Sequence, residues 1–188
     1  MNFETVFYTV QAIVLQVSDP AAGWRELVAL AQSQVGPGGV ATLTALDFAA
    51  DVRHIRTQLA DIVSEAPVPE SIDTLFFGLF DAWIEDSDDE EIGFYVSGVQ
   101  GFDPDDPDTL VDPLWFPENR FLDSQALRAI KACADAHSTS RDFLEYGVAL
   151  GAATLLARFA APVRTPSLRI VVGFDDGDYL VLPTTAPN

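Results

Sequence analysis

Hydrophobic residues change their spacing after Pro69. Before that point they recur every three or four residues, the period of an amphipathic helix, in runs separated by short breaks. The sequence therefore predicts three helices, over residues 3–17, 20–35 and 44–65. Asp19 is expected to cap the second helix, and Thr44 with Asp47 forms a variant of the capping box at the start of the third. The Gly-Pro-Gly-Gly stretch at 36–39 should end the second helix.

Beyond Pro69 the pattern becomes that of strands. Residues 73–80 and 92–99 predict a first hairpin, and residues 168–174 and 179–182 predict a second, joined by an Asp-Gly turn signal. Between the hairpins we expect one helix capped by Ser124 and another from about 141 to 160. The latter is apolar almost all round, which is typical of a central core helix, and Gly147 and Gly151 would let another element approach it closely.

The predicted order of elements is ααα-ββ-αα-ββ. Two hairpins without βαβ alternation indicate an α+β fold, with an antiparallel sheet of about four strands packed with about five helices. Because two of the predicted strands are apolar on both faces, we expect both faces of the sheet to be covered. We expect one domain over residues 1–188, comprising a three-helix part (1–66) and a sheet-containing part (72–183).

Acidic residues dominate the charge: 29 Asp and Glu stand against 10 Lys and Arg, which gives a net charge of −19. Fourteen of the acids lie between Asp81 and Asp123, where Arg120 is the one basic residue. This charge would repel the phosphates of nucleic acids and anionic membrane surfaces, so neither is expected as a partner. It favours a basic protein partner, or serves solubility alone.

The location is predicted from two further features. The N-terminal apolar run carries Glu4 and lacks the basic start of a signal peptide, and it is too short and polar to span a bilayer. The single cysteine, Cys133, leaves no intramolecular disulfide to form. We therefore expect a cytoplasmic protein.

Catalytic and metal-binding patterns are missing from the sequence. The two histidines, His54 and His137, are not placed with a nucleophile, and Cys133 is better explained as a buried structural thiol. The Asp-rich stretches starting at Asp86 and Asp103 both fail the EF-hand spacing, and no phosphate-binding loop occurs. We expect no catalytic residue, metal or cofactor. The alternative is a carboxylate-based or metal-assisted enzyme that uses the same acidic loops.

Two acidic loops flank the first predicted hairpin, and we expect them to converge at one edge of the sheet. Exposed aromatic residues next to them would anchor a partner while the carboxylates attract a basic one. The expected partner-binding residues are Glu85, Asp86, Asp88, Asp89, Glu90, Glu91, Asp103, Asp105, Asp106, Asp108, Trp115, Phe116 and Glu118. The alternative is that the aromatic residues belong to the core and the acids form a solvated rim.

Several short motifs carry a resemblance to a known group of proteins. They are residues 75–80 with the sequence FGLFD at 77–81, Tyr95-x-x-Gly98, Phe102-Asp103-Pro104, Trp115-Phe116-Pro117-Glu118, Leu122-x-Ser124-x-x-Leu127 and the run 172–178. Over residues 72–130 and 168–182 the chain resembles bacterial immunity proteins of polymorphic toxin systems. The resemblance implies a non-enzymatic cytoplasmic protein that binds and neutralises a cognate toxin, such as a secreted toxin domain with a basic active-site cleft. It assigns no binding residue and no oligomeric state.

Overall fold

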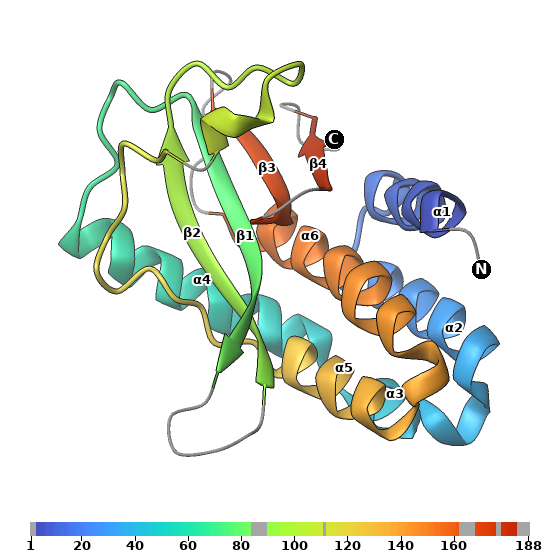
Figure 1. The fold of residues 1–188 in the computed structure, drawn as a ribbon. Coiled ribbons are helices and arrows are strands. Elements are labelled where there is room, and N and C mark those ends of the chain that lie inside the picture. The colour runs from blue at the N-terminus through green and yellow to red at the C-terminus, as the bar shows by residue number, and fades with distance from the viewer. Residues whose placement is uncertain (1–2, 84–89, 111, 162–167, 176–177, 184–188) are drawn as a thin grey trace.

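The computed structural model describes residues 3–83, 90–110, 112–161, 168–175 and 178–183. These residues form the expected α+β fold (Figure 1). The α-helices are α1 (Phe3–Gln16), α2 (Pro20–Gly39), α3 (Ala41–Ala45), α4 (Phe48–Glu65), α5 (Gln125–Ala136) and α6 (Ala149–Ala160). The strands are β1 (Thr74–Trp83), β2 (Glu90–Val99), β3 (Arg169–Phe174) and β4 (Tyr179–Leu182). Shorter helical turns are η1 (Pro107–Leu110), η2 (Ser138–Ser140) and the π-helical η3 (Phe143–Val148).

Helix α2 starts as predicted but ends later. The side chain of Asp19 accepts a hydrogen bond from the backbone N–H of Ala22 at 2.8 Å and so caps its first turn. The Gly-Pro-Gly-Gly stretch ends the first helical segment at Gly36, as predicted, but a second, short segment follows it and extends α2 to Gly39. Gly36 adopts a φ of 78° and kinks the chain, and helical turns resume from Pro37, which suits the first position of a new helical segment.

The third predicted helix is two helices. Thr44 lies inside the short helix α3 and donates its hydroxyl to the carbonyl of Val40 at 2.9 Å, so it caps nothing. Leu46 has an extended backbone, which breaks the helical path. Helix α4 then starts at Phe48, where the side chain of Asp47 accepts from the N–H of Ala50 at 3.0 Å. Of the two residues in the predicted capping box, Asp47 is the one that caps a helix, as the N-cap of α4.

The sheet has the order β2-β1-β3-β4. Both predicted hairpins are antiparallel, but β1 and β3 run parallel, in a register from Thr74 opposite Arg169 to Leu79 opposite Phe174. The prediction of an antiparallel sheet is therefore wrong, and the sheet is mixed. The chain leaves β2, passes through α5 and α6 in the helical layer, and returns as β3 on the far side of β1, parallel to β1 and opposite in direction to β2 (Figure 1).

The α-helices cover one face of the sheet, with α6 at the centre of the helical layer. Helix α6 contacts α1, α2, α4 and α5 as well as β1 and β3. The glycines of this region are packed as tightly as predicted, because a Cβ atom at Gly151 in α6 would lie 2.7 Å from the side chain of Leu27, and one at Gly147 in the preceding turn η3 would lie 2.6 Å from that of Val6. Close approach of α1 and α2 to this helix therefore depends on both glycines.

The helix predicted over 141–160 is present, although its first part is the π-helical turn η3. The segment Phe143–Ala160 is long and apolar enough to cross a membrane, yet 78% of it is buried inside the protein. Such burial is what a core helix requires, and it accounts for the apolar composition of the segment.

The other face of the sheet, here called the outer face, is covered by a loop instead of by helices. Phe102 and Leu110, from the connection between β2 and α5, are buried together with Phe76, Val99 and Val171 on the outer face. Cover on both faces was predicted, and the loop supplies it over one part of the sheet only. The rest of the outer face, towards the β1–β2 turn, is where the candidate site lies.

Candidate functional site

Aromatic rings lie flat across glycines on the outer face. Gly78 pairs with Tyr95, and Gly93 pairs with Phe80, across β1 and β2. A Cβ atom at Gly78 would overlap the ring of Tyr95, and one at Gly93 would overlap the ring of Phe80. The ring of Tyr95 therefore takes the space that a side chain at position 78 would need. Through these two pairs, the ring of Tyr95 covers the backbone at Gly78 and the ring of Phe80 covers the backbone at Gly93.

Residues 114–122 run along the edge of β2 that does not face β1, which we call the β2 edge. The N–H of Val96 donates to Arg120 O at 3.1 Å, and the N–H of Leu122 donates to Phe94 O at 2.8 Å. Isolated bridges pair Gly98 with Trp115 and Tyr95 with Phe121. The segment therefore acts as an irregular extra strand that covers this edge from Phe94 to Gly98.

The extended backbone of this segment separates the two aromatic residues that we expected to act together. Trp115 turns into the core, is 5% exposed, and donates its indole N–H to Ala66 O at 3.1 Å. Phe116 turns outward and is 51% exposed, as is Phe121 at 52%. Trp115 is therefore unable to contact a partner through its ring, which corrects its place among the expected binding residues. Phe121 takes its place.

Arg120 lies between the two exposed phenylalanine rings. Its guanidinium carbon is 3.7 Å from the centre of the Phe116 ring and 4.4 Å from that of Phe121. The Phe121 ring in turn lies 5.8 Å from Phe80, and Phe116 lies 6.3 Å from Tyr95. Phe80, Tyr95, Phe116, Arg120 and Phe121 thus form one continuous surface, called the aromatic strip below. Stacking on both sides of the guanidinium holds the exposed rings in place.

A hollow of about 430 Å³ opens beside the aromatic strip, lined by Tyr95, Leu110, Pro113, Phe116 and Asp175. The Tyr95 hydroxyl donates to the Asp175 carboxylate at 2.6 Å across it. Burial of the phenol, then the hydrogen bond to Asp175 and its negative charge, raise the pKa of Tyr95 above its usual range. The pair ties the loop after β3 to the middle of β2.

This raised pKa predicts how stability depends on pH. The folded protein keeps the Tyr95 proton at pH values where the unfolded chain releases it, so the contribution of the group is complete below about pH 10 and is lost as the pH rises further. We expect the free energy of unfolding to fall between about pH 10 and pH 12, and to fall less steeply in Tyr95→Phe. Urea unfolding of both proteins at a series of pH values measures the two slopes. Equal slopes would show that Tyr95 keeps an ordinary pKa.

The expected acidic residues that the structure describes do not gather at one edge of the sheet, and residues 85–89 of the prediction lie outside the described part of the chain. Asp103, Asp105 and Asp106 form a tight turn beyond the end of β2, in which the N–H of Asp105 donates to the Asp103 carboxylate at 2.9 Å. Glu90 and Glu91 lie at the start of β2, a strand of 10 residues, whereas this turn follows its end. Figure 1 shows the start and the end of β2 at opposite ends of the sheet. The aromatic strip lies between them.

The remaining expected binding residues fall in several places. Glu118 is exposed on the segment beside the aromatic strip, and Asp108 lies in η1. Glu90 forms an ion pair with Arg141 at 3.3 Å. Four residues lie outside the described part of the chain: Glu85, Asp86, Asp88 and Asp89.

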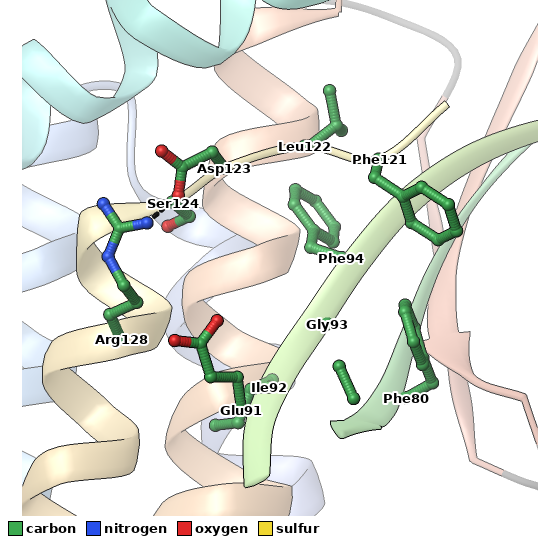
Figure 2. A pocket seen from close by; sticks show the side chains of 11 residues that line it. Phe80, Glu91, Ile92, Gly93, Phe94, Phe121, Leu122, Asp123, Ser124 and Arg128 are labelled. Atoms are coloured by element: carbon green, nitrogen blue, oxygen red, sulfur yellow. Dashed lines mark hydrogen bonds and ion pairs between the residues drawn. The ribbon is translucent and has the colours of Figure 1, made fainter. Parts of the chain in front are cut away.

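A second hollow, of about 280 Å³, lies where residues 121–124 leave the β2 edge. Figure 2 shows Glu91, Ile92 and Gly93 on one side of it and Asp123 and Arg128 on the other. Arg128 forms an ion pair with Asp123, which leaves Glu91 as an exposed carboxylate without an ion pair among the described residues. The aromatic strip borders this hollow through Phe80 and Phe121.

The residues tested for catalysis from the sequence have structural contacts. Cys133 is buried, with its Sγ 3.2 Å from Gly39 O, and burial raises the pKa of its thiol. His137 lies 2.8 Å from the carbonyl of Cys133 through Nδ1, at the end of α5. Within the described ranges, no three His, Cys, Asp or Glu side chains come together as metal ligands do.

Of the aromatic strip, only Phe116 was among the binding residues predicted from the sequence. Tyr95, Phe80 and Arg120 come together only through the strand register and the path of residues 114–122. One signal was present: Arg120 is the single base among fourteen acids between Asp81 and Asp123, and such an isolated base in an acidic stretch marks a specific contact. The chain matches no protein-family model, no curated protein and no solved structure.

Proposed function

We propose that this chain is a non-enzymatic binding protein that holds a basic protein partner against the aromatic strip. The observation that carries the proposal is the stack of Phe116, Arg120 and Phe121, in which both rings are half-exposed yet fixed on the two faces of one guanidinium. Aromatic residues and arginine are enriched among the residues that dominate binding energy at protein interfaces. Rings that are already fixed lose little conformational entropy when a partner covers them.

The charges around the aromatic strip favour a basic partner. Glu118 is exposed beside it, Glu91 is exposed at one end, and the turn of Asp103, Asp105 and Asp106 is exposed at the other. In the described part of the chain none of these five forms an ion pair, and the whole chain carries −19. An apolar centre with a charged rim is the usual anatomy of an interface, and the rim sets the rate and salt dependence of association.

The more specific role rests on the resemblance to immunity proteins. On that basis the partner is a toxin, such as a secreted toxin domain, with a basic active-site cleft that the acidic surface covers. Inhibition of this kind needs tight occlusion and no chemistry by the inhibitor. It fits a chain that presents a rigid aromatic surface together with a large negative charge.

The proposal predicts that Phe116→Ala with Phe121→Ala weakens partner binding by about 30-fold or more, because truncation of a central anchor typically costs about 2 kcal/mol. The tagged protein is used at low salt to capture partners from cells of its source organism, a basic protein among them is identified, and the dissociation constant of the purified pair is measured. Increased salt should weaken the same complex.

Tyr8→Ala is the matched control, because Tyr8 is 59% exposed on α1, on the far side of the molecule from β2 in Figure 1. It should leave the affinity unchanged. For the toxin role, co-expression with the wild-type protein should restore the growth of cells that produce the partner, whereas the double variant should not. Equal affinity of the double variant and the wild type would overturn the assignment of the surface. Failure of any basic protein to bind would overturn the proposed function.

A further inference from the structure

Near its start, at Ile92 and Phe94, the β2 edge has backbone N–H and C=O groups that form no hydrogen bond with the described residues. In an antiparallel strand each residue directs its N–H and C=O to the same side, and successive residues alternate. Val96 and Gly98 direct theirs to residues 114–122, as does the carbonyl of Phe94. By the same alternation, Ile92 directs its N–H and C=O to this edge, and Phe94 its N–H. These three groups have no hydrogen-bond partner among the described residues.

The covering segment leaves the edge at this point for a defined reason. After Leu122 the chain must reach α5, and the Ser124 hydroxyl is held there by a hydrogen bond of 2.8 Å to Asp51 on α4. Residues 123–124 therefore turn towards the helical layer, and the second hollow opens between them and β2 (Figure 2). The contact with Asp51 thus fixes where the extra strand ends and keeps the edge beyond it open.

We propose that the open β2 edge, from Glu91 to Phe94, receives an extended basic segment of the protein partner as an added strand. The segment would continue the line of residues 114–122 and pair with Ile92 and Phe94, which is the β-augmentation mode of recognition. This inference rests on the proposed function, and it specifies how the partner binds. Its defining contact is the backbone pairing with Ile92 and Phe94, which the aromatic rings do not supply, so the two can fail separately.

The side chains next to the open β2 edge define the chemistry of the segment. Glu91, Gly93 and Tyr95 alternate onto the outer face, so side chains of an added strand on that face meet the carboxylate of Glu91 and then the rings of Phe80 and Phe121. A basic residue fits the first position, and an apolar residue two places along fits the second. The segment is therefore expected to alternate basic and apolar residues on its outward side.

A second copy of this chain fits the edge poorly. Self-pairing of two β2 edges around Ile92 would bring Glu90 and Glu91 of both copies close together, and like charges on neighbouring strands are destabilising. The net charge of −19 opposes such a contact further. A basic segment from another protein relieves the repulsion that a second copy would increase.

Amide hydrogen exchange tests whether the open β2 edge is unpaired in the free protein and pairs with a basic segment. In the free protein the amides of Ile92 and Phe94 should exchange quickly, whereas those of Val96 and Leu122, which are hydrogen-bonded at the edge, should exchange slowly. The probe is the capped peptide acetyl-Lys-Thr-Val-Thr-Lys-Thr-Val-amide, in which Lys and Val alternate on one face, with the same peptide carrying Glu in place of Lys as its control. The basic peptide should slow exchange at Ile92 and Phe94 by about tenfold or more when bound.

A pair of variants at one position tests the contact itself. Ile92→Pro removes the outward N–H and leaves the ladder to β1 intact, because that ladder uses the residues on either side. Ile92→Val keeps the N–H and is the matched control. We expect Ile92→Pro to weaken binding of the basic peptide by about tenfold, which corresponds to one backbone hydrogen bond, and Ile92→Val to leave it unchanged. The wild-type exchange data remain decisive if Ile92→Pro does not fold.

Three outcomes would overturn the inference: no slowing of exchange at Ile92 and Phe94, equal binding of the acidic peptide, or slow exchange in the free protein that depends on its concentration. The last would identify a second copy as the occupant. If the peptide binds the edge but Phe116→Ala with Phe121→Ala still binds the captured partner normally, the assignment of the aromatic strip fails and the edge stands. If the reverse holds, the aromatic strip stands and the partner does not add a strand.

Discussion

Gly151→Leu is expected to lower the free energy of unfolding by about 3 kcal/mol. A Cβ atom at this position would lie 2.7 Å from Leu27 on α2 and 3.0 Å from Val10 on α1. Helix α6 is buried between these helices and the sheet, so the larger side chain has no open space to occupy. The α1 and α2 helices must therefore move outward, which breaks contacts along their whole length.

Urea unfolding measures this effect, which should appear as a lower midpoint with an unchanged slope. Gly38→Leu is the control, since nothing lies within 4 Å of a Cβ atom there. The double variant Gly151→Leu with Leu27→Ala should recover part of the loss, because truncation at Leu27 makes room for the new side chain. A full cost in the double variant would show that the clash with Leu27 is not the cause.

Asp51→Ala is expected to cost about 3 kcal/mol, or about 6–12 °C in Tm for a chain of this size. Asp51 is 3% exposed on α4, and its carboxylate accepts hydrogen bonds at the start of α5. The donors are the Ser124 hydroxyl at 2.8 Å and the N–H groups of Gln125 at 3.1 Å and Ala126 at 2.9 Å. Removal of the carboxylate takes the acceptor away from these three hydrogen-bond donors, and it removes a negative charge from the N-terminus of α5.

Thermal unfolding of Asp51→Ala, Asp51→Asn and Asp61→Ala measures the contribution of this carboxylate. Asp61 is an exposed acid on the same helix and should matter little. Asp51→Asn should lie between the two, because its amide keeps one acceptor oxygen. The result would count against the role of Asp51 if Asp61→Ala were as costly as Asp51→Ala. Amide exchange at Gln125 and Ala126 should also accelerate in Asp51→Ala, which locates the effect.

The fold was predictable where neighbours in sequence determine it. Helix boundaries at Asp19 and Ser124 and the antiparallel pairing of β3 with β4 depend on residues that are close in sequence. The parallel pairing of β1 with β3 is different, because it joins strands that β2, α5 and α6 separate in the sequence. The N-terminus of α5 shows the same difference. Its cap by Ser124 is predicted by a short sequence motif, whereas its second cap, by Asp51, comes from a distant helix and has no local sequence pattern.

The candidate site was predictable only in part for the same reason. Phe116 and the acidic residues follow from composition, but an extended segment sends neighbouring side chains to opposite sides, and this puts Trp115 in the core. The partnership of Arg120 with two phenylalanine rings depends on the turn between positions 116 and 121. Placement of the acids at opposite ends of β2 depends on the length of that strand, which the sequence defined less well than its existence.

The sheet order also has a consequence during protein synthesis. Strand β1 lies inside the sheet, yet its second neighbour, β3, ends at Phe174, long after β1 ends at Trp83. At typical elongation rates the ribosome needs about 5–20 s to make the intervening chain. For that interval Phe76, Phe77 and Leu79 belong to an apolar strand with one unpaired edge, which is prone to aggregate. The acids that follow β1 in the sequence emerge with it, so they keep nascent chains apart before they can contact any partner.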